Sequence, residues 1–276
     1  MKLLAVAVAG RGVVDPDEPV FRAGDEALLR GRAAFETTRV YGGRPFCLPQ
    51  HVARLAASAL SLGLEPPDAG ETERLAATAL QAAATPEAGL RLYWTGTTLV
   101  ATVAEVPAEL EERRARGQRL VSLQLGVEPG PPGWLLPGVK STSYAVNMAG
   151  EAEARRRGAD DAVFLANGNV VLEAPISNIW WRRGGTLHTP ALEAGVLAGV
   201  TRATLLELAP AVGYRVEEGL FTLDHLAGAD ESFTSSSIRE VLPVVELDGR
   251  AIGDGAPGEA AEALQHALRM RATAIR

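Results

Sequence analysis

Apolar residues recur along the first part of the chain with two different spacings. Residues 1–8 and 35–48 are rich in apolar, β-branched and aromatic side chains, which is typical of strands. Residues 49–63 and 70–84 instead carry apolar side chains every three or four positions, the spacing of an amphipathic helix. Residues 90–106 then give two strands around a tight turn. The pattern therefore predicts a first domain that mixes strands with helices.

The pattern changes after residue 106. Residues 107–117 are polar and charged, which favours an irregular connection between two domains. Beyond them the chain mixes strands, hairpins and helices again. The elements that we expect are a strand at 119–127, an irregular loop at 128–138, helices at 142–158, 199–212, 222–229 and 257–274, and hairpins that turn at 167–169 and 184–185.

Strands and helices alternate too irregularly for a doubly wound sheet. We expect a fold of the α/β and α+β classes. It comprises a small α/β domain over residues 1–106, the connection at 107–117, and a larger domain over residues 118–276. A chain of 276 residues is long enough to bury a core in each domain without disulfides or metals.

Composition narrows the classes of function. The net charge of −7 disfavours nucleic acid or an anionic membrane as a partner. The apolar run at the N-terminus stops at Arg11 without a cleavage site, so we expect a strand there rather than a signal peptide. Cys47 is the only cysteine, so no internal disulfide can form and a cytoplasmic location is expected. The four histidines lack metal-ligand spacing, and we expect no metal.

Lysine is almost absent from the chain. Of the 27 basic residues, all are arginine except Lys2 and Lys140. Arginine replaces lysine in most surface roles because it keeps its charge and pairs well with carboxylates. Arginine does not readily form a Schiff base, however. Lys140 is therefore either a remaining surface charge or a lysine that the chemistry of the protein requires.

Five segments extend this observation. In chain order they read FETTRVYGGRPFCLPQHVARL, PGVKSTSY, GNVVLEAPISNIWW, GVLAGVTRATLLELA and SSSIREVLPVVELDG. Their order and wording resemble the class IV aminotransferases, the pyridoxal-phosphate (PLP) enzymes of fold type IV, from about residue 20 to about residue 255. The family includes branched-chain aminotransferases, D-amino-acid aminotransferases and aminodeoxychorismate lyases. The resemblance implies the two-domain fold type IV, a barrel-like sheet in the larger domain, PLP between the domains, and a homodimer.

The same resemblance implies roles for single residues. Lys140 matches the lysine that forms the Schiff base, an amine whose pKa falls when it is buried near an electron-poor ring. Glu173 matches the glutamate that binds the pyridine nitrogen, and Arg54 matches the arginine that binds the phosphate. Further cofactor contacts are implied at a helix start, in a run of serines and close to the lysine: Val200, Thr201, Ser236, Ser237 and Tyr144.

Each of these residues also has an ordinary structural interpretation. Glu173 is a candidate for an exposed carboxylate at a strand end, and Arg54 for a solvated charge on an amphipathic helix. Thr201 is a candidate for a helix N-cap, and Tyr144 for a core tyrosine. The run of serines is equally typical of a solvated turn. The sequence leaves both interpretations open.

The cofactor residues do not select the reaction, which depends on the groups that bind the substrate carboxylate. Relatives that act on D-amino acids carry an Arg-x-His pair for this purpose after the strand that contains residues 90–95, and this chain has none there. Arg91, Arg30 and Arg32 are candidates for a replacement anion site, or are ordinary surface arginines. The pair Thr37-Thr38 is similar, at an offset of one position, to two threonines of the lyases, and the hydroxyl of Thr38 is a candidate for proton transfer in the elimination.

We expect from this a transaminase that exchanges amino groups between D-amino acids and 2-oxo acids, with primary amines as a further candidate class. A 4-amino-4-deoxychorismate lyase that releases p-aminobenzoate and pyruvate is the alternative, and a branched-chain L-amino-acid aminotransferase is the third. Other classes fit less well. The chain has neither a G-x-G-x-x-G dinucleotide motif nor a G-x-S-x-G nucleophile elbow. A protein that only carries PLP would not need both a Schiff-base lysine and Glu173.

Overall fold

The computed structural model describes residues 2–274, which divide into two compact units. The first unit contains the chain up to Pro107 together with Val139–Tyr144. The second contains Ala108–Gly138 and the chain from Ala145 onward. Residues 139–144 therefore pack with the first unit, although they lie within the larger domain that the sequence predicts. Lys140 is one of these residues.

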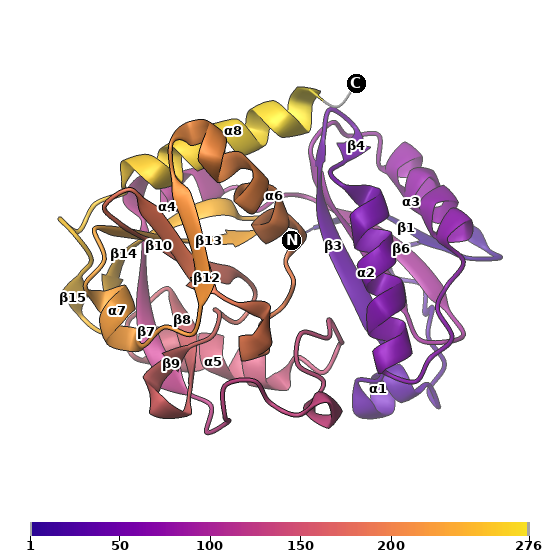
Figure 1. The fold of residues 1–276 in the computed structure, drawn as a ribbon. Coiled ribbons are helices and arrows are strands. Elements are labelled where there is room, and N and C mark those ends of the chain that lie inside the picture. Colours follow the sequence, from indigo (N-terminus) through magenta and orange to yellow (C-terminus); the bar gives the residue numbers. More distant parts are fainter. Residues whose placement is uncertain (1, 275–276) are drawn as a thin grey trace. The chain divides into compact units, whose positions relative to one another are not determined.

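The first unit is a six-stranded sheet with helices over one face (Figure 1). Its strands pair antiparallel in the order β2-β1-β6-β5-β3-β4. The elements are β1 (Leu3–Val8), β2 (Gly12–Val14), β3 (Ala34–Tyr41), β4 (Arg44–Pro45), β5 (Ala88–Trp94) and β6 (Leu99–Ala104), with α1 (Glu26–Arg30), α2 (Leu48–Ser61) and α3 (Ala69–Ala83). The two expected helices and the strands at residues 1–8 and 90–106 are confirmed.

The core of this unit lies between the sheet and helices α2 and α3. Val52, Leu55 and Ala59 form the buried stripe of α2, with the spacing of one helix face. They pack in the same cluster as Leu90 and Leu92 of β5. Burial of a leucine side chain contributes about 1.5–3 kcal/mol. The apolar spacing read from the sequence therefore fixes which face of α2 meets the sheet.

The second unit contains a nine-stranded sheet that curls into a half-barrel, as the sequence predicts (Figure 1). Its strands run in the order β12-β11-β10-β13-β14-β7-β8-β9, and β15 pairs with β14. The strands are β7 (Gln118–Gln124), β8 (Asp161–Ala166), β9 (Val170–Val171), β10 (Asn178–Arg183), β11 (Thr186–Pro190), β12 (Arg215–Gly219), β13 (Glu231–Ser236), β14 (Glu240–Leu247) and β15 (Arg250–Ala251). The helices are α4 (Leu110–Arg116), α5 (Ala145–Arg156), α6 (Val200–Leu208), α7 (Leu223–Ala227) and α8 (Glu259–Ala274), with short 3-10 turns η1 (Gly133–Leu135), η2 (Asn167–Asn169), η3 (Leu192–Ala194) and η4 (Ala209–Val212).

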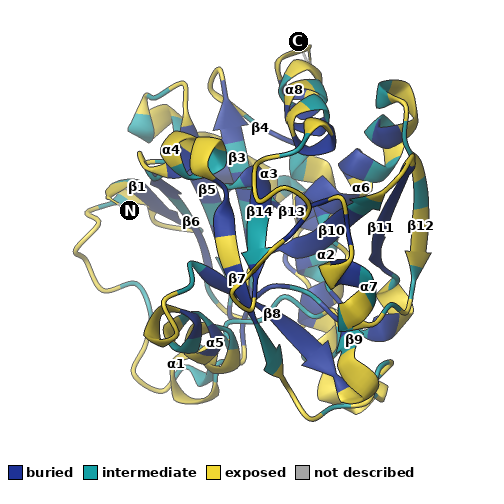
Figure 2. Cartoon of the chain, turned by 90° about the vertical axis from the view of Figure 1, so that its left-hand side faces the viewer, coloured by how far each residue is buried: buried dark blue, intermediate teal, exposed yellow. Residues whose placement is uncertain are grey.

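Burial separates the central strands of this sheet from its edge (Figure 2). Every residue of β8 is buried, whereas the edge strand β12 is mostly exposed. The large side chains of Trp180 and Trp181 on β10 and of Phe233 on β13 are fully buried. The hairpins expected at 167–169 and 184–185 are confirmed by the antiparallel pairs β8–β9 and β10–β11.

One expected element is wrong. Residues 110–116 form α4, a regular helix, where the charged composition of 107–117 predicts an irregular connection. Leu110 is its only buried residue, and its basic residues lie in the last turn, where they complement the negative end of the helix dipole. Composition alone did not separate a short charged helix from a loop. Among residues 2–274, no helix is both long and apolar enough to span a bilayer.

Candidate active site

Lys140 lies on a short segment that extends the sheet of the first unit beside β3. Phe35 donates its backbone N–H to the carbonyl of Lys140 at 3.1 Å, and Ala34 forms an antiparallel bridge with Ser141. The backbone N–H of Lys140 donates to Ser58 Oγ of α2 at 3.2 Å. These bonds fix the main chain of Lys140 between the end of a strand and a helix.

The Lys140 amine lies against aromatic rings. Its Nζ is 4.3 Å from the centroid of the Phe35 ring and 5.8 Å from that of Tyr144. The two rings meet edge to face, with centroids 5.3 Å apart. Cation–π attraction holds an ammonium at such a position and limits its contact with water. Tyr144 is thus close to the lysine, as the sequence predicts, and its role toward a cofactor remains a prediction.

The two faces of β3 carry different chemistry. Residues at even positions, Glu36 and Thr38, are buried on the side of α2, whereas Phe35 and Thr37 lie on the opposite face. Phe35 pairs with Tyr93, and Thr37 pairs with Arg91. Directly paired residues place their side chains on the same face of a sheet. Arg91 therefore shares a face with the ring that contacts Lys140.

The face of β3 that is covered by α2 contains a buried ionic cluster. Arg54 of α2 donates from Nε to Glu36 Oε1 at 2.7 Å and from Nη2 to Oε2 at 2.8 Å. His51 Nδ1 lies 2.7 Å from the same carboxylate. The side chains of Glu36 and His51 are 1% exposed, and that of Arg54 is 14% exposed. This bidentate geometry fixes the plane of the guanidinium.

Electrostatics keeps Glu36 charged in this cluster. Burial raises the pKa of Glu36, but the hydrogen bonds from Arg54 and His51 outweigh burial and bring the pKa from 4.5 to about 2. Burial lowers the pKa of His51, and the neighbouring Glu36 carboxylate only partly opposes that effect. The cluster is therefore an ion pair between Glu36 and Arg54, with His51 on the same carboxylate. It orients Arg54, the residue predicted to bind the phosphate.

Three of the residues predicted to bind substrate have other contacts. Arg32 donates to the carbonyls of Leu62 and Gly63 and to Glu26, at 2.9–3.0 Å. Arg30 has a side chain that is 76% exposed. Thr38 is 2% exposed and donates its hydroxyl to the carbonyl of Phe46 at 2.6 Å. Of the four predicted residues, Arg91 alone shares the sheet face with Phe35.

Glu173 lies in the second unit, just after β9. Its Oε2 accepts a hydrogen bond from Asn178 Nδ2 at 3.0 Å, and its Oε1 accepts one from the backbone N–H of Leu197 at 3.1 Å. Asn178 Nδ2 also donates to the carbonyl of Leu197 at 2.9 Å. Asn178 thereby connects Glu173 to the turn that precedes α6. The carboxylate is held from two sides, so its direction is set by the fold.

The start of α6 follows that turn. A Cβ on Gly199, the N-cap residue, would lie 2.1 Å from Asn178 Oδ1, so the close approach of Asn178 requires glycine. Gly199 has no side chain that could accept hydrogen bonds from the first backbone N–H groups of α6. These N–H groups lie at the positive end of the helix dipole. Val200 and Thr201, both predicted to contact the phosphate, are buried in this first turn. Such an end suits an anion.

Ser236 and Ser237 lie where β13 turns into β14. Ser236 is the last residue of β13 and pairs with Glu240, the first residue of β14. Both serines are partly buried, and the turn between the strands contains only residues 237–239. A turn this short fixes the direction of the two hydroxyl-bearing residues through its backbone. Their role as phosphate donors remains a prediction.

Sequence reasoning missed several residues of these sets. Glu36 and His51 lie 15 positions apart and meet only because β3 and α2 pack together. Asn178 follows Glu173 by five positions, and its amide was not distinguished from an ordinary turn residue. Alternation along β3 carried a signal that separates Thr37 from Thr38. The alternation can be used to assign Thr37 and Thr38 to faces only once it is known which face of β3 is covered by α2.

Known proteins similar to this chain match most of its length. The sequence profile of the Amino-transferase class IV family matches residues 33–247. A bifunctional aminodeoxychorismate lyase / D-amino acid transaminase from Mycobacterium tuberculosis is 31% identical over 261 residues, which cover 87% of this chain and 90% of that protein. A D-alanine aminotransferase from Bacillus licheniformis is 29% identical, with 89% of each chain covered. The structure of a hypothetical aminotransferase from Mycobacterium tuberculosis in its PLP-bound form superposes with a TM-score of 0.91 at 29% identity, over 99% of this chain and 100% of that one.

Proposed function

We propose that this chain, which belongs to the class IV aminotransferase family, transfers amino groups between D-amino acids and 2-oxo acids. Members of this family use PLP. Bound PLP supplies an aldehyde that condenses with amines and a pyridine ring that withdraws electrons from the substrate's α-carbon. The similar proteins include both transaminases and lyases, so the choice of reaction depends on the residues of this chain.

The residues present fit PLP. Lys140 offers an amine on a rigid segment, and Glu173 offers a carboxylate whose two oxygens are already held by Asn178 and Leu197. A carboxylate so placed suits a protonated ring nitrogen, because it retains the proton there. Arg54 and the first turn of α6 supply the donors and positive charge that a phosphate group requires. We propose these residues of the two units as the ones that hold the cofactor.

A single observation carries the choice of a transaminase. Arg91 lies on the same face of the first unit's sheet as Phe35, the ring that contacts the Lys140 amine. A guanidinium binds a carboxylate through two parallel hydrogen bonds. Arg91 therefore supplies the anion site for an α-carboxylate on the face that carries the reactive amine. The same site serves the carboxylate of an amino acid and of the 2-oxo acid that replaces it.

The division of labour among the residues follows. Arg91 binds the substrate carboxylate and so orients the α-carbon. Lys140 would hold the cofactor, and its amine is the group that can take the proton from that α-carbon as a general base. The rings of Phe35 and Tyr144 keep water from the amine. Glu36 holds the guanidinium of Arg54 in a fixed plane, in which it would be available to a phosphate.

Half-reactions test this function directly. The purified PLP form is mixed separately with D-alanine, D-glutamate and L-leucine, and the absorbance of the cofactor is followed. We expect the D-amino acids to convert the cofactor to its amine form and 2-oxoglutarate to restore it, with L-leucine inactive. Conversion by L-leucine alone would assign the branched-chain activity instead. Conversion by no amino acid would overturn the proposal.

Arg91→Gln tests the assigned carboxylate site. Loss of charge-assisted hydrogen bonds to a carboxylate corresponds to about 1.5–3 kcal/mol, so we expect KM for both the D-amino acid and the 2-oxo acid to rise on the order of tenfold to a hundredfold. Arg74→Gln is the matched control, since Arg74 lies on α3 with a side chain that is 75% exposed. Equal KM values for the Arg91 variant, the control and the wild type would remove Arg91 from the site.

The aminodeoxychorismate lyase is a second candidate, and one observation favours it. Thr37 lies on the face of β3 that carries Phe35, next to its partner Arg91, so its hydroxyl is on the side of the Lys140 amine. A hydroxyl there can pass a proton during elimination. If the chain is a lyase, it releases p-aminobenzoate from aminodeoxychorismate, and Thr37→Val slows that release. Absence of p-aminobenzoate would dismiss the lyase and leave the transaminase.

A further inference from the structure

Glu240 is a buried carboxylate at an unusual backbone position. It is the first residue of β14, directly after the turn at 237–239 that follows Ser236, and it is 0% exposed. Its φ angle is +56°, in the left-handed region. A residue other than glycine, asparagine or aspartate costs about 1 kcal/mol or more in that region. Such a conformation persists only where the surrounding contacts determine it.

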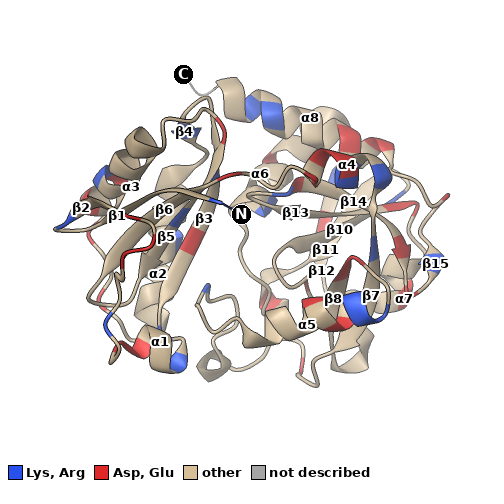
Figure 3. Cartoon of the chain, turned by 180° about the vertical axis from the view of Figure 1, so that it is seen from behind, with Lys and Arg blue, Asp and Glu red and all other residues tan. Residues whose placement is uncertain are grey.

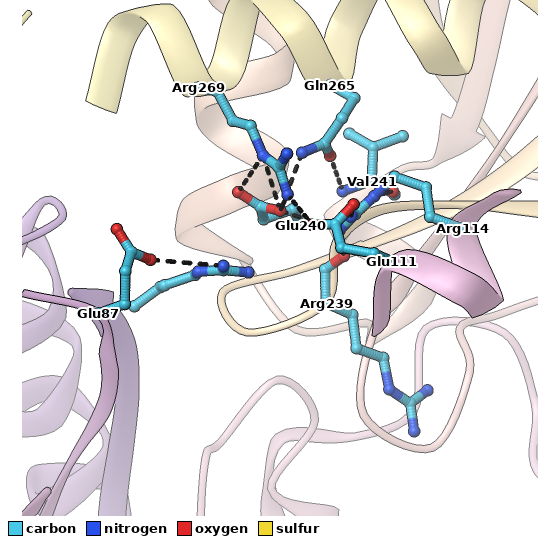
Figure 4. Close-up of polar contacts among 9 residues, drawn as sticks. Glu87, Glu111, Arg114, Arg239, Glu240, Val241, Gln265 and Arg269 are labelled. Carbon is cyan, nitrogen blue, oxygen red and sulfur yellow. Dashed lines mark hydrogen bonds and ion pairs between the residues drawn. The ribbon is translucent and has the colours of Figure 1, made fainter. Parts of the chain in front are cut away.

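The contacts that determine it come from three helical side chains of the second unit (Figure 4). Arg114 of α4 donates to Glu240 Oε2 at 2.9 Å, and Arg269 of α8 donates to the same oxygen at 2.8 Å. Gln265 of α8 donates from Nε2 to it at 2.9 Å and accepts the N–H of Val241 at 2.9 Å. We call these four residues, Glu240, Arg114, Gln265 and Arg269, the Glu240 clamp.

The clamp holds the main chain of the turn as well as the carboxylate. Arg114 donates from Nη2 to the carbonyl of Arg239 and from Nε to the carbonyl of Val241, both at 3.0 Å. The two residues on either side of Glu240 are therefore bound by the same guanidinium. Figure 3 shows acidic and basic residues on both α4 and α8. The backbone of the turn cannot rotate without breaking several charged hydrogen bonds.

From this geometry we propose that Glu240 is a positioning residue, which fixes the β13–β14 turn so that Ser236 and Ser237 present their donors to the phosphate of the cofactor. The inference rests on the proposed function, in which these serines bind that phosphate. Glu240 itself does not touch the cofactor. Its carboxylate acts through the turn, and the charges of Arg114 and Arg269 keep it from repelling a nearby phosphate.

The phosphate group offers a readout that a purely structural role would not change. Full-length protein freed of cofactor is titrated with PLP and with pyridoxal, which has the same aldehyde and ring but no phosphate. Glu240→Gln keeps the shape of the side chain and removes its charge. We expect the affinity for PLP to fall on the order of tenfold, the size of effect that loss of an orienting partner has at metal sites, and the affinity for pyridoxal to stay within about twofold.

Glu231→Gln is the matched control. Glu231 is also a buried glutamate of this sheet, 3% exposed, and it too binds α8, accepting hydrogen bonds from the N–H groups of Ala260 and Ala261 at 3.1–3.2 Å. It lies at the opposite end of β13 from the turn. We expect its substitution to lower the melting temperature without changing the ratio of PLP to pyridoxal affinity.

A double variant, Ser236→Ala with Ser237→Ala, separates two claims: that the serines bind the phosphate, and that Glu240 positions them. If the serine variant loses affinity for PLP but not for pyridoxal, and Glu240→Gln does the same, both claims hold. If the serine variant loses it and Glu240→Gln matches the wild type or weakens both ligands equally, the positioning role is wrong while the phosphate site stands. If the serine variant keeps the wild-type ratio, the turn does not bind the phosphate and the inference falls with it.

Discussion

The two units each contain a fully buried glutamate that is paired with arginine, but the two carboxylates hold different things. Glu36 sits within β3 and binds the side chains of Arg54 and His51. Glu240 sits beside a turn in a left-handed conformation, and its partner Arg114 also binds two backbone carbonyls. In the first unit the buried charge orients a side chain. In the second it fixes a stretch of main chain.

The two clusters also differ in how their charges are balanced. Arg54 and Glu36 form a bidentate pair, and His51 and the backbone N–H of Thr37 also contact the carboxylate. In the Glu240 clamp, Arg114 and Arg269 each have a second carboxylate, that of Glu111, with the Arg114 pair at 2.7 Å. Removing the charge of Glu240 therefore leaves its two arginines with the carboxylate of Glu111, whereas removing the charge of Glu36 breaks a bidentate pair. The comparison predicts unequal costs for the same substitution.

Glu36→Gln is expected to have the larger effect on stability. Breaking a buried ion pair from one side costs about 3–5 kcal/mol, because the remaining charge stays buried. Glu240→Gln leaves Glu111 in place and is expected to cost about 1–3 kcal/mol. Urea unfolding of both variants with a common slope measures the difference. Equal costs, or a larger cost for Glu240→Gln, would break the comparison.

The next largest effect is expected in acid, where protonation of Glu36 removes the stabilisation that its pair with Arg54 provides. The pKa of Glu36 is lowered from 4.5 to about 2 in the fold, so its stabilisation is complete above about pH 4.5 and is lost as the pH falls toward 2. This difference corresponds to about 3 kcal/mol. Burial also lowers the pKa of His51, so the unfolded chain binds that proton first and stability falls further below pH 6.5.

Stability curves of wild type and Glu36→Gln against pH provide the measurement. We expect the two curves to converge between pH 4.5 and 2, because the variant has no carboxylate left to protonate. Parallel curves over that range would mean that the carboxylate of Glu36 does not have a lowered pKa in the fold.

Most helices and strands followed from local patterns, because the apolar stripe of α2 and the alternation along β3 are written within a few consecutive residues. The ionic clusters did not follow. Glu240 is 126 positions from Arg114 and 29 positions from Arg269 in the sequence. No local spacing therefore predicts their contact. The rarity of lysine drew attention to Lys140, and the family resemblance gave it its predicted role. Arg32 was not separable from Arg91, since its carbonyl partners at residues 62 and 63 lie in a distant loop.

An exposed ion pair between α8 and α6 gives the smallest expected effect on stability. Arg271 of α8 pairs with Glu207 at 2.9 Å, with side chains that are 49% and 62% exposed. Exposed ion pairs contribute about 0–1 kcal/mol, so Glu207→Gln should change the unfolding free energy by less than about 1 kcal/mol. A cost equal to that of Glu240→Gln would show that burial is not what distinguishes the clamp from an ordinary surface pair on α8.

The assignment of Lys140 as the lysine that carries the cofactor underlies all of the proposed chemistry. It can be measured directly, because the chain offers only two lysines. The PLP-loaded protein is reduced with borohydride, which makes the bond between cofactor and lysine permanent, and its peptides are mapped by mass spectrometry. The account predicts the cofactor mass on the peptide that contains Lys140 and on no other. Attachment at Lys2, or no attached cofactor, would contradict it.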